Sequence, residues 1–415
     1  MREGDGAAWS YPARRVAAVG RRSGPGGPNG AAASTVVAGA LVALAAVLAG
    51  CAPPAAARPG AEPILYVANG RDGTVSRLDS ATGRPVGAPL PAGPAPAQVV
   101  ASRDGHLLVA PTTFDRGTDL TLVTRDAGAG AARPVRLESG ARQVLLTADG
   151  GDHALVAYGR PGAPPGAADA RCRLVLVDLR TGEVAPPRTV CGGRDAVVGL
   201  ALDDPQDGDP VAYLAIWRPP APEDDCAPAT GNRIVAVQLH TGAAVAVAPL
   251  AGVPDRLVLA PAGRTGRRLY AVEAAPLPST GLPDACPYMT HSKYVVNAGQ
   301  WALVRLAPDT LAVERRYPLP QPPYALAVAP GGDHAYALTP VSVVLHVDLV
   351  RGTDRPLATL ADVPLGIAVA ADRVYVSDPR ADAVRVLDRE SGRVVRVLPT
   401  GRGPIAVTLS GRAAR

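Results

Sequence analysis

The sequence is poor in lysine, methionine and aromatic residues, and it lacks a concentrated basic region. Its 415 residues include 2 Met, 1 Phe, 3 Trp and 5 Cys, and Lys293 is the only lysine. The formal net charge is +5. Three of these five charges come from the first 51 residues, which hold five arginines against Glu3 and Asp5. Nucleic-acid binders carry a dense basic patch, so we expect no nucleic-acid partner.

Long apolar runs are absent, apart from one near the N-terminus. Residues 35–48 (TVVAGALVALAAVL) are uncharged and follow two arginine pairs. The run is shorter than the roughly 20 residues that cross a bilayer comfortably. It is typical of the apolar core of a secretory signal peptide.

The end of this run, Leu48-Ala49-Gly50-Cys51, resembles the lipobox of bacterial lipoproteins. The resemblance implies a lipid on Cys51, which would anchor the protein to the cell membrane on the extracytoplasmic side. We therefore expect a leader and signal peptide over 1–50, a Pro/Ala tether over 51–63 and the folded domain over 64–411. The alternative is an uncleaved signal anchor, in which Cys51 is only a small residue at its end.

Helical periodicity is missing from the rest of the chain, and a repeat of short strands takes its place. The first copy reads LYVA (65–68), VSRLD (75–79), a third strand near 86–90 and, after a Gly/Pro loop, the apolar QVVA (98–101). The second residue of the first strand recurs at Tyr66, Leu108, Leu155, Tyr213, Tyr270, Tyr336 and Tyr375.

A glycine at a fixed distance after the second strand strengthens the repeat. The strand ends at Asp79, Thr124, Asp178, Gln238, Ala307, Asp348 and Asp388. Four residues beyond each end lie Gly83, Gly128, Gly182, Gly242, Leu311, Gly352 and Gly392. A tight hairpin needs a positive φ at such a position, which glycine adopts freely. Seven units of four strands predict an all-β fold, a seven-bladed β-propeller of four-stranded antiparallel blades.

The runs LYVAN, VSRLDSATG, VYVSD and VRVLDRESG resemble the YVTN-repeat (YncE-like) β-propeller family. The resemblance covers about residues 64–411, and it implies the fold and a binding or surface role without naming a ligand. In such propellers, which are similar in repeat design to WD40 proteins, the apolar strand lies innermost. The C-terminal strand near 405–409 should then complete the blade begun by the N-terminal strands, closing the ring.

The units differ mainly in one loop type, which connects the second and third strands counted from the axis. Blades three, four and five carry long insertions there, at 159–171, 218–232 and 273–300. Loops of one type emerge on one face, so these insertions should lie side by side. Four cysteines map to this face. Exported proteins commonly pair their cysteines, and we favour Cys172–Cys191 and Cys226–Cys286 among three possible pairings.

The same face gathers rare aromatic side chains and polar residues at the mouth of the central channel. These two groups form our candidate ligand-binding surface, because binding sites combine apolar walls with a few polar groups. The alternative is that the aromatic residues only pack beneath long loops. The candidate residues are Arg142, Gln143, Arg194, Asp195, Asp255, Arg256, Trp217, Tyr288, His291, Lys293 and Trp301.

Other chemistry finds little support. His106, His153 and His334 fall in equivalent turns of three different blades, so we expect no metal site. The acidic turn with Asp203, Asp204, Asp207 and Asp209 lacks the spacing of an EF-hand. No nucleophile-elbow motif occurs, and we expect no catalytic residues and no cofactor.

The sequence therefore favours a monomeric, membrane-tethered binding or scaffold module without enzymatic activity. Its ligand would be a small molecule, glycan, peptide or envelope protein on the long-loop face. The alternatives are a propeller enzyme of lactonase-like or quinoprotein-like type, by fold analogy alone, and a purely structural envelope protein.

The lipoprotein prediction has a direct test. Mass spectrometry of the protein from a bacterial membrane fraction should find Cys51 at the N-terminus with a diacylglyceryl group. Cys51→Ala should release the protein from that fraction. An intact N-terminus with an unmodified Cys51 would contradict the prediction.

Overall fold

A computed structural model describes residues 63–102, 104–111, 119–124, 132–137, 143–148, 151–159, 172–192, 195–204, 209–218, 231–262, 266–275 and 300–410. The chain divides into two compact units, Met1–Arg58 and Pro59–Arg415, and every described residue belongs to the second. Cys51 lies outside the described residues. Within the described ranges, no helix is long and apolar enough to cross a membrane.

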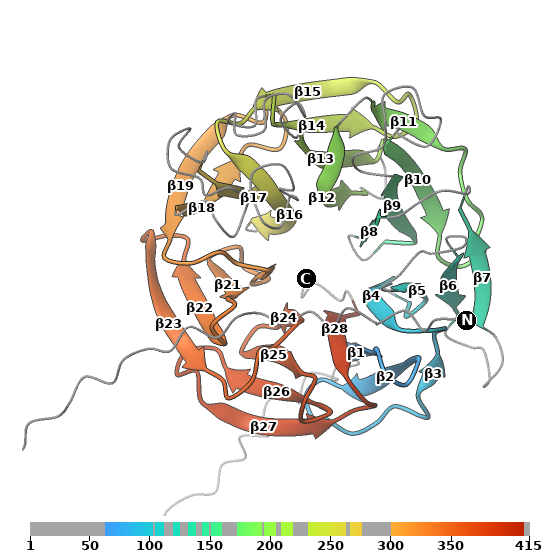
Figure 1. Cartoon of the computed structure of the whole chain (residues 1–415), viewed down its shortest axis with the longest axis vertical. Helices are drawn as coiled ribbons and strands as arrows, with labels where there is room; N and C mark the ends of the chain where they lie inside the picture. Colours follow the sequence, from blue (N-terminus) through green and yellow to red (C-terminus); the bar gives the residue numbers. More distant parts are fainter. Residues whose placement is uncertain are drawn as a thin grey trace, which may run out of the picture. The chain divides into compact units, whose positions relative to one another are not determined.

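The described strands form seven four-stranded antiparallel sheets that stand around a central axis as the blades of a propeller (Figure 1). This architecture confirms the predicted fold. From the innermost to the outermost strand, blade 1 is β28 (Pro404–Leu409), β1 (Ile64–Asn69), β2 (Thr74–Asp79) and β3 (Leu90–Pro91). In the same order, blade 2 is β4 (Pro96–Ala101), β5 (Leu107–Pro111), β6 (Asp119–Val123) and β7 (Ala132–Arg136).

The remaining blades each use four consecutive strands, again given from the axis outwards. Blade 3 is β8 (Gln143–Thr147), β9 (His153–Gly159), β10 (Cys172–Asp178) and β11 (Arg188–Cys191). Blade 4 is β12 (Ala196–Asp203), β13 (Val211–Trp217), β14 (Arg233–Gln238) and β15 (Ala244–Pro249). Blade 5 is β16 (Val253–Ala262), β17 (Gly266–Ala274), β18 (Trp301–Leu306) and β19 (Val313–Leu319). Blade 6 is β20 (Ala325–Val328), β21 (His334–Leu338), β22 (Val343–Asp348) and β23 (Thr353–Thr359). Blade 7 is β24 (Ile367–Val369), β25 (Arg373–Asp378), β26 (Ala383–Asp388) and β27 (Val394–Pro399).

The ring closes because the C-terminal strand completes the first blade. β28 pairs antiparallel with β1, with Leu65 opposite Leu409 and Val67 opposite Val407. Beside this pair, the Gly70 N–H donates to the Gly403 carbonyl at 2.8 Å. The predicted closure is therefore confirmed, and it pairs the inner edge of β1 with the outer edge of β28, two edges that would otherwise be open.

Seven clusters of buried apolar side chains hold the blades together, and each cluster draws on two neighbouring blades. The repeated tyrosine, which lies in the second strand of its blade counted from the axis, belongs to these clusters. Tyr375 of blade 7 is 2 % exposed, and its hydroxyl donates to the Ser80 carbonyl of blade 1 at 3.0 Å. Burial raises the pKa of Tyr213 and of Tyr336 to about 12. The repeat position therefore combines apolar burial with a hydroxyl that stays protonated.

The outer hairpins have the backbone that the glycine pattern predicted. Gly83, Gly182, Gly242, Gly352 and Gly392 all have φ between 70° and 83°. Leu311, the single non-glycine residue of the pattern, keeps the same backbone with φ of 57°. The preceding aspartate accepts the turn's N–H groups in several blades, for example Asp79 from Thr82 at 2.6 Å. These hydrogen bonds hold the pKa of the Asp79 carboxyl below its ordinary value.

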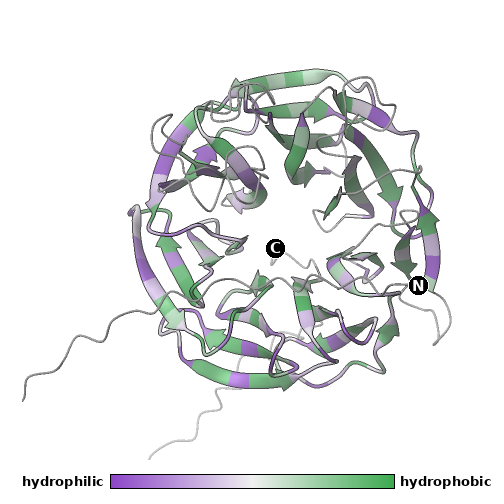
Figure 2. Ribbon diagram, in the orientation of Figure 1, coloured by the Kyte–Doolittle hydropathy of each residue, from purple (hydrophilic) through white to green (hydrophobic). Residues whose placement is uncertain are grey.

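An arginine of the outer strand fastens each of five blades to the hairpin of the next blade. Arg396 of β27, for instance, donates to the Ala81 carbonyl at 2.8 Å, and Arg315 of β19 to the Val350 carbonyl at 2.8 Å. The arginines that make this contact are Arg133, Arg188, Arg315, Arg355 and Arg396. Hydrophilic residues accordingly gather on outer strands such as β7 and β19, while the inner strands are largely apolar (Figure 2).

Blade 4 replaces this polar contact with an apolar one. In the strand register, Ala246 of β15 stands where Arg315 and Arg396 stand in their own blades. The facing hairpin position in blade 5 is Leu311, which is 1 % exposed and belongs to the cluster against which Ala246 packs. Elsewhere the small glycine leaves room for the guanidinium group, as at Gly242, where a Cβ atom would lie only 2.7 Å from Arg188 Nη1. At this interface the apolar contact of Ala246 with Leu311 thus takes the place of the arginine and glycine found at the same positions in other blades.

One strand differs from its expected position. The third strand of blade 1 was expected near 86–90, but β3 comprises only Leu90 and Pro91. An isolated bridge joins Leu78 to Pro85 before it. Because proline lacks a backbone N–H, the segment from Pro85 to Pro91 cannot form a continuous ladder.

The exchange in blade 4 predicts a strong energetic coupling. Ala246→Arg should lower the free energy of unfolding by about 2 kcal/mol, because the guanidinium meets the buried Leu311 side chain. Leu311→Gly should cost a similar amount by opening a cavity. The double variant should recover at least about 1 kcal/mol of the summed loss in urea unfolding. Strictly additive effects would contradict the substitution of one contact by the other.

Candidate functional site

The three insertions connect β9 to β10, β13 to β14 and β17 to β18, which are the second and third strands of blades 3, 4 and 5. The strand ends that flank these insertions lie on one face of the three consecutive blades. Several of the predicted ligand-binding residues fall outside the described residues. These are Arg142, Arg194, Tyr288, His291 and Lys293. Gln143 begins β8 and stands opposite Gly159 at the same edge.

The predicted Cys172–Cys191 disulfide is confirmed. Its two cysteines are opposite each other in β10 and β11, with Cα atoms 5.0 Å apart. The bridge joins the end of the first insertion to the outer strand of the same blade. Cys226 and Cys286 lie outside the described residues, so their pairing stays a prediction.

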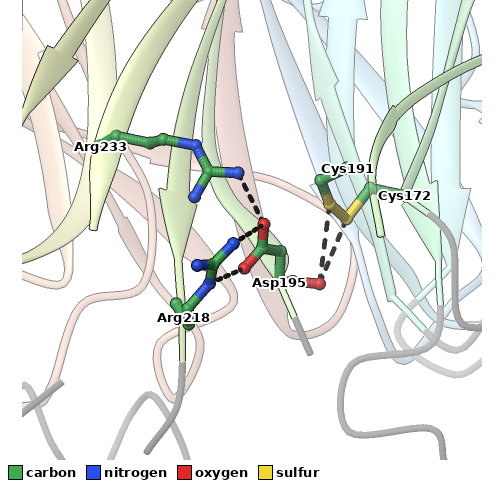
Figure 3. The surroundings of a disulfide bond; sticks show 5 residues. All are labelled: Cys172, Cys191, Asp195, Arg218 and Arg233. Atoms are coloured by element: carbon green, nitrogen blue, oxygen red, sulfur yellow. Dashed lines mark hydrogen bonds and ion pairs between the residues drawn. A yellow bond between two sulfur atoms is a disulfide. The ribbon is translucent and has the colours of Figure 1, made fainter. Parts of the chain in front are cut away.

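Beside this disulfide lies a buried aspartate held by two arginines (Figure 3). Arg218 donates through Nε and Nη2 to the two oxygens of Asp195, at 2.6 and 3.0 Å, and Arg233 Nη2 donates to Oδ2 at 2.6 Å. The Asp195 side chain is 3 % exposed. Burial alone would raise the pKa of its carboxyl, but the two guanidinium groups outweigh burial and lower it. Asp195 was predicted to bind ligand, whereas its carboxylate is engaged by the protein itself.

This arrangement fixes the roots of the second insertion. Arg218 is the first residue of that insertion, directly after β13, and Arg233 opens β14, the strand that follows it. The backbone carbonyl of Asp195 lies 3.3 Å from Cys172 Sγ and 3.6 Å from Cys191 Sγ. One aspartate therefore links the disulfide of blade 3 to both ends of the insertion in blade 4.

The polar connections continue into blade 5. Asn232 accepts the backbone N–H of Arg218 at 3.1 Å, and its Nδ2 donates to the Gly252 carbonyl at 3.0 Å. Gly252 in turn donates its N–H to Glu273 Oε1 at 2.7 Å, and Arg316 pairs with the other oxygen of that carboxylate. Glu273 is 4 % exposed and lies near the end of β17, where the third insertion begins. The roots of the insertions thus share one continuous network.

No protein-family model matches the chain, and no curated protein matches it. Many solved structures are similar to it, including the following three. A functionally unknown protein from Desulfotomaculum acetoxidans has 13% identity, with 83% of this chain and 98% of that chain covered and a TM-score of 0.53. The dihydro-heme d1 dehydrogenase NirN in complex with DHE has 18% identity, with 87% of this chain and 78% of that chain covered and a TM-score of 0.51. Sqt1 from Saccharomyces cerevisiae has 11% identity, with 82% of this chain and 83% of that chain covered and a TM-score of 0.52. These likenesses establish a β-propeller fold. They do not extend to the YVTN-repeat family or to an activity.

Asp255 and Arg256 lie in the innermost strand of blade 5, as expected for the channel mouth. The register of β16 slips between Pro254 and Leu257, so the two residues form a bulge. Arg256 Nε pairs with Asp255 Oδ2 at 3.1 Å, and the Arg256 side chain remains 42% exposed. Bulges often redirect side chains at functional sites. Arg256 is therefore the arginine among the described candidates, and its side chain is partly exposed.

The two tryptophans serve mainly as packing groups. Trp217 is 6 % exposed and belongs to the buried cluster between blades 4 and 5. Trp301, at the start of β18, is half-buried and packs against two such clusters. Packing beneath the insertions was the alternative to ligand binding, and the burial of Trp217 agrees with that alternative.

His153, His240 and the described part of the acidic turn lie on the opposite face, and Asp207 lies outside the described residues. His153 Nδ1 lies 3.0 Å from Asp204 Oδ2, His240 pairs with Asp209, and Arg267 pairs with Asp203. In blade 6, His334 Nδ1 and His346 Nε2 are 3.0 Å apart. Among the described residues, no three His, Cys, Asp or Glu side chains are grouped so as to hold a metal ion.

Sequence reasoning missed Arg218, Arg233, Asn232, Glu273 and Arg316. A signal was present, because the third residue after the repeated tyrosine is polar and buried in four blades. Its members are Asn69, Glu273, Thr339 and Asp378. Asp378 accepts Arg385 Nε at 2.7 Å, as Glu273 accepts Arg316. The side-chain partners lie on another strand, so spacing along the chain alone did not identify them.

The buried ion pairs predict a pH-dependent contribution to stability. Asp195→Asn should lower the free energy of unfolding at pH 7 by about 2–3 kcal/mol, because two guanidinium groups lose their counter-charge. A lowered carboxyl pKa stabilises the fold above the unfolded value near 4, and this stabilisation disappears as the pH falls below it. The difference between variant and wild type in urea unfolding should therefore shrink between pH 5 and about pH 3.

Asp362→Asn is the matched control. Its partner, Arg380, is 80 % exposed and lies 2.9 Å away, so solvent screens the pair. We expect a loss below about 1 kcal/mol. Equal losses for the two variants, or a pH-independent loss for Asp195→Asn, would contradict the assigned role of Asp195.

Proposed function

We propose that the protein is a membrane-tethered, extracytoplasmic binding or scaffold module without enzymatic activity, and that it binds its partner through the long-loop face of blades 3 to 5. The lipobox-like sequence ending at Cys51 supports the tether. The proposed ligand is a small molecule, a glycan, a peptide or an envelope protein.

One observation carries this proposal, namely the network at the roots of the insertions. A disulfide, the buried Asp195 and the buried Glu273 connect the strand ends of three neighbouring blades on one face. Charged groups buried at such roots stabilise the fold only weakly compared with apolar packing. They do fix the directions in which the chain leaves the blades. Loops on a rigid scaffold are the usual location of binding residues.

The chemistry of the described part of this face favours an anionic group on the ligand. Arg256 presents a partly exposed guanidinium on the innermost strand. Arginine binds carboxylate and phosphate groups through paired hydrogen bonds. Arg142 and Arg194 precede the innermost strands of blades 3 and 4, so we propose that they serve the same purpose.

The test compares arginine variants on the two faces. Bacteria expressing the tagged wild type, Arg256→Ala or Arg351→Ala would be cross-linked, and the retained proteins, glycans and metabolites would be quantified by mass spectrometry. Arg351 is the control, because its side chain is 81% exposed and its hairpin is on the opposite face. Loss of one charge-assisted hydrogen bond costs about 1.5–3 kcal/mol, which corresponds to a reduction in affinity of roughly tenfold or more.

The proposal predicts a partner that wild type and Arg351→Ala retain and that Arg256→Ala loses. Equal retention by all three forms would place the binding surface elsewhere. Turnover of a retained metabolite by the purified protein would favour the enzymatic alternative.

A further inference from the structure

Two histidines on neighbouring strands of blade 6 bring their ring nitrogens together. His334 opens β21, and His346 lies in the middle of β22. In the strand register, His334 is opposite Asp348, and Tyr336 is opposite His346. The two histidines are thus diagonal neighbours on one side of the blade, and a hydrogen bond of 3.0 Å joins His334 Nδ1 and His346 Nε2, which a metal ion bound to both nitrogens would replace.

The surrounding side chains hold both rings in place. His334 Nε2 lies 3.5 Å from Asp333 Oδ2. The other oxygen of that carboxylate, Oδ1, is buried and has no hydrogen-bond partner among the described residues. The Tyr336 ring stacks on His346, with ring centres 5.1 Å apart and an interplanar angle of 24°. A carboxylate on the outer nitrogen of a histidine is the common means of orienting that ring toward a metal ion.

The repeat shows that this pair is particular to blade 6. His106 and His153 occupy the position of His334 in blades 2 and 3. In those blades the position of His346 is held by Leu122 and Leu176. A leucine therefore satisfies the packing at this position, and the fold by itself does not need a second histidine.

We propose that His334 and His346 bind a divalent transition metal ion between them, with Asp333 positioning His334. Two imidazole nitrogens 3.0 Å apart, each about 2.0 Å from a metal, give an angle at the metal of roughly 95°. That angle suits two adjacent positions of a tetragonal site better than a tetrahedral one. Tetragonal nitrogen and oxygen sites favour Cu²⁺ or Ni²⁺, and water would supply the remaining ligands.

Charged groups around the two histidines affect how strongly they can bind a cation. Arg355 and Arg389 act on His346 as positive charges, and they oppose a cation. Arg355 is engaged with the Glu390 carbonyl at 2.6 Å. Asp333 and Asp348 are the carboxylates beside the pair. With two histidine ligands and partly offset charge, the site is suited to reversible binding. The side chain of His334 is 25 % exposed, so solvent reaches the pair.

The experiment titrates the full-length, oxidised protein with Cu²⁺ alone at pH 7, followed by calorimetry and electron paramagnetic resonance. We expect one tetragonal copper with hyperfine coupling to two nitrogens. His334→Gln and His346→Leu should each weaken this binding by at least about tenfold, and Asp333→Asn by about tenfold. His346→Leu copies the residue of blades 2 and 3, so it should fold normally, which circular dichroism would verify.

His153→Gln is the matched control, because His153 has the position of His334 in a blade without the second histidine. It should leave copper binding unchanged. Absence of a two-nitrogen spectrum in the wild type would overturn the proposal. So would a spectrum that survives in both His334→Gln and His346→Leu, because copper would then occupy other residues.

Discussion

Packing of one blade against the next is the interaction on which the rest of the structure depends. Every cluster of buried apolar side chains belongs to two adjacent blades, so a single four-stranded sheet has no core of its own. The ring must therefore close, and the pairing of β28 with β1 joins the first and last parts of the sequence. Apolar burial at these interfaces is the main stabilising contribution.

Polar contacts then specify how neighbouring blades align. Outer-strand arginines donate to hairpin carbonyl oxygens of the next blade, and buried tyrosine hydroxyls do the same closer to the axis. Leu311 illustrates how tightly the two sides are matched. It keeps the left-handed backbone of the glycine that it replaces, and it faces an alanine where the other blades have arginine. Each position was thus constrained by a residue on a different blade.

The two faces of the propeller carry different chemistry on this shared framework. On the long-loop face, buried carboxylates accept hydrogen bonds from arginines at the roots of the insertions, and the partly exposed Arg256 lies in an innermost strand. On the opposite face, histidines pair with aspartates, between blades 3 and 4 at His153 and within blade 4 at His240. Because the loops of one type all begin and end on one face, the strand ends that flank insertions in consecutive repeats lie on neighbouring blades without any change in the blades.

The sequence by itself predicted the number of blades, the strand order, the closing strand and the hairpin glycines, and it favoured the Cys172–Cys191 bridge among three possible pairings. Each of these follows from a periodic pattern or from local backbone chemistry, which spacing along the chain records. Only the tertiary structure decided that Asp195 is neutralised by Arg218 and Arg233, that Trp217 is a packing residue, and that His334 meets His346. These relations depend on which side of a strand a side chain takes and on what the neighbouring strand presents there. Sequence separation does not encode that information.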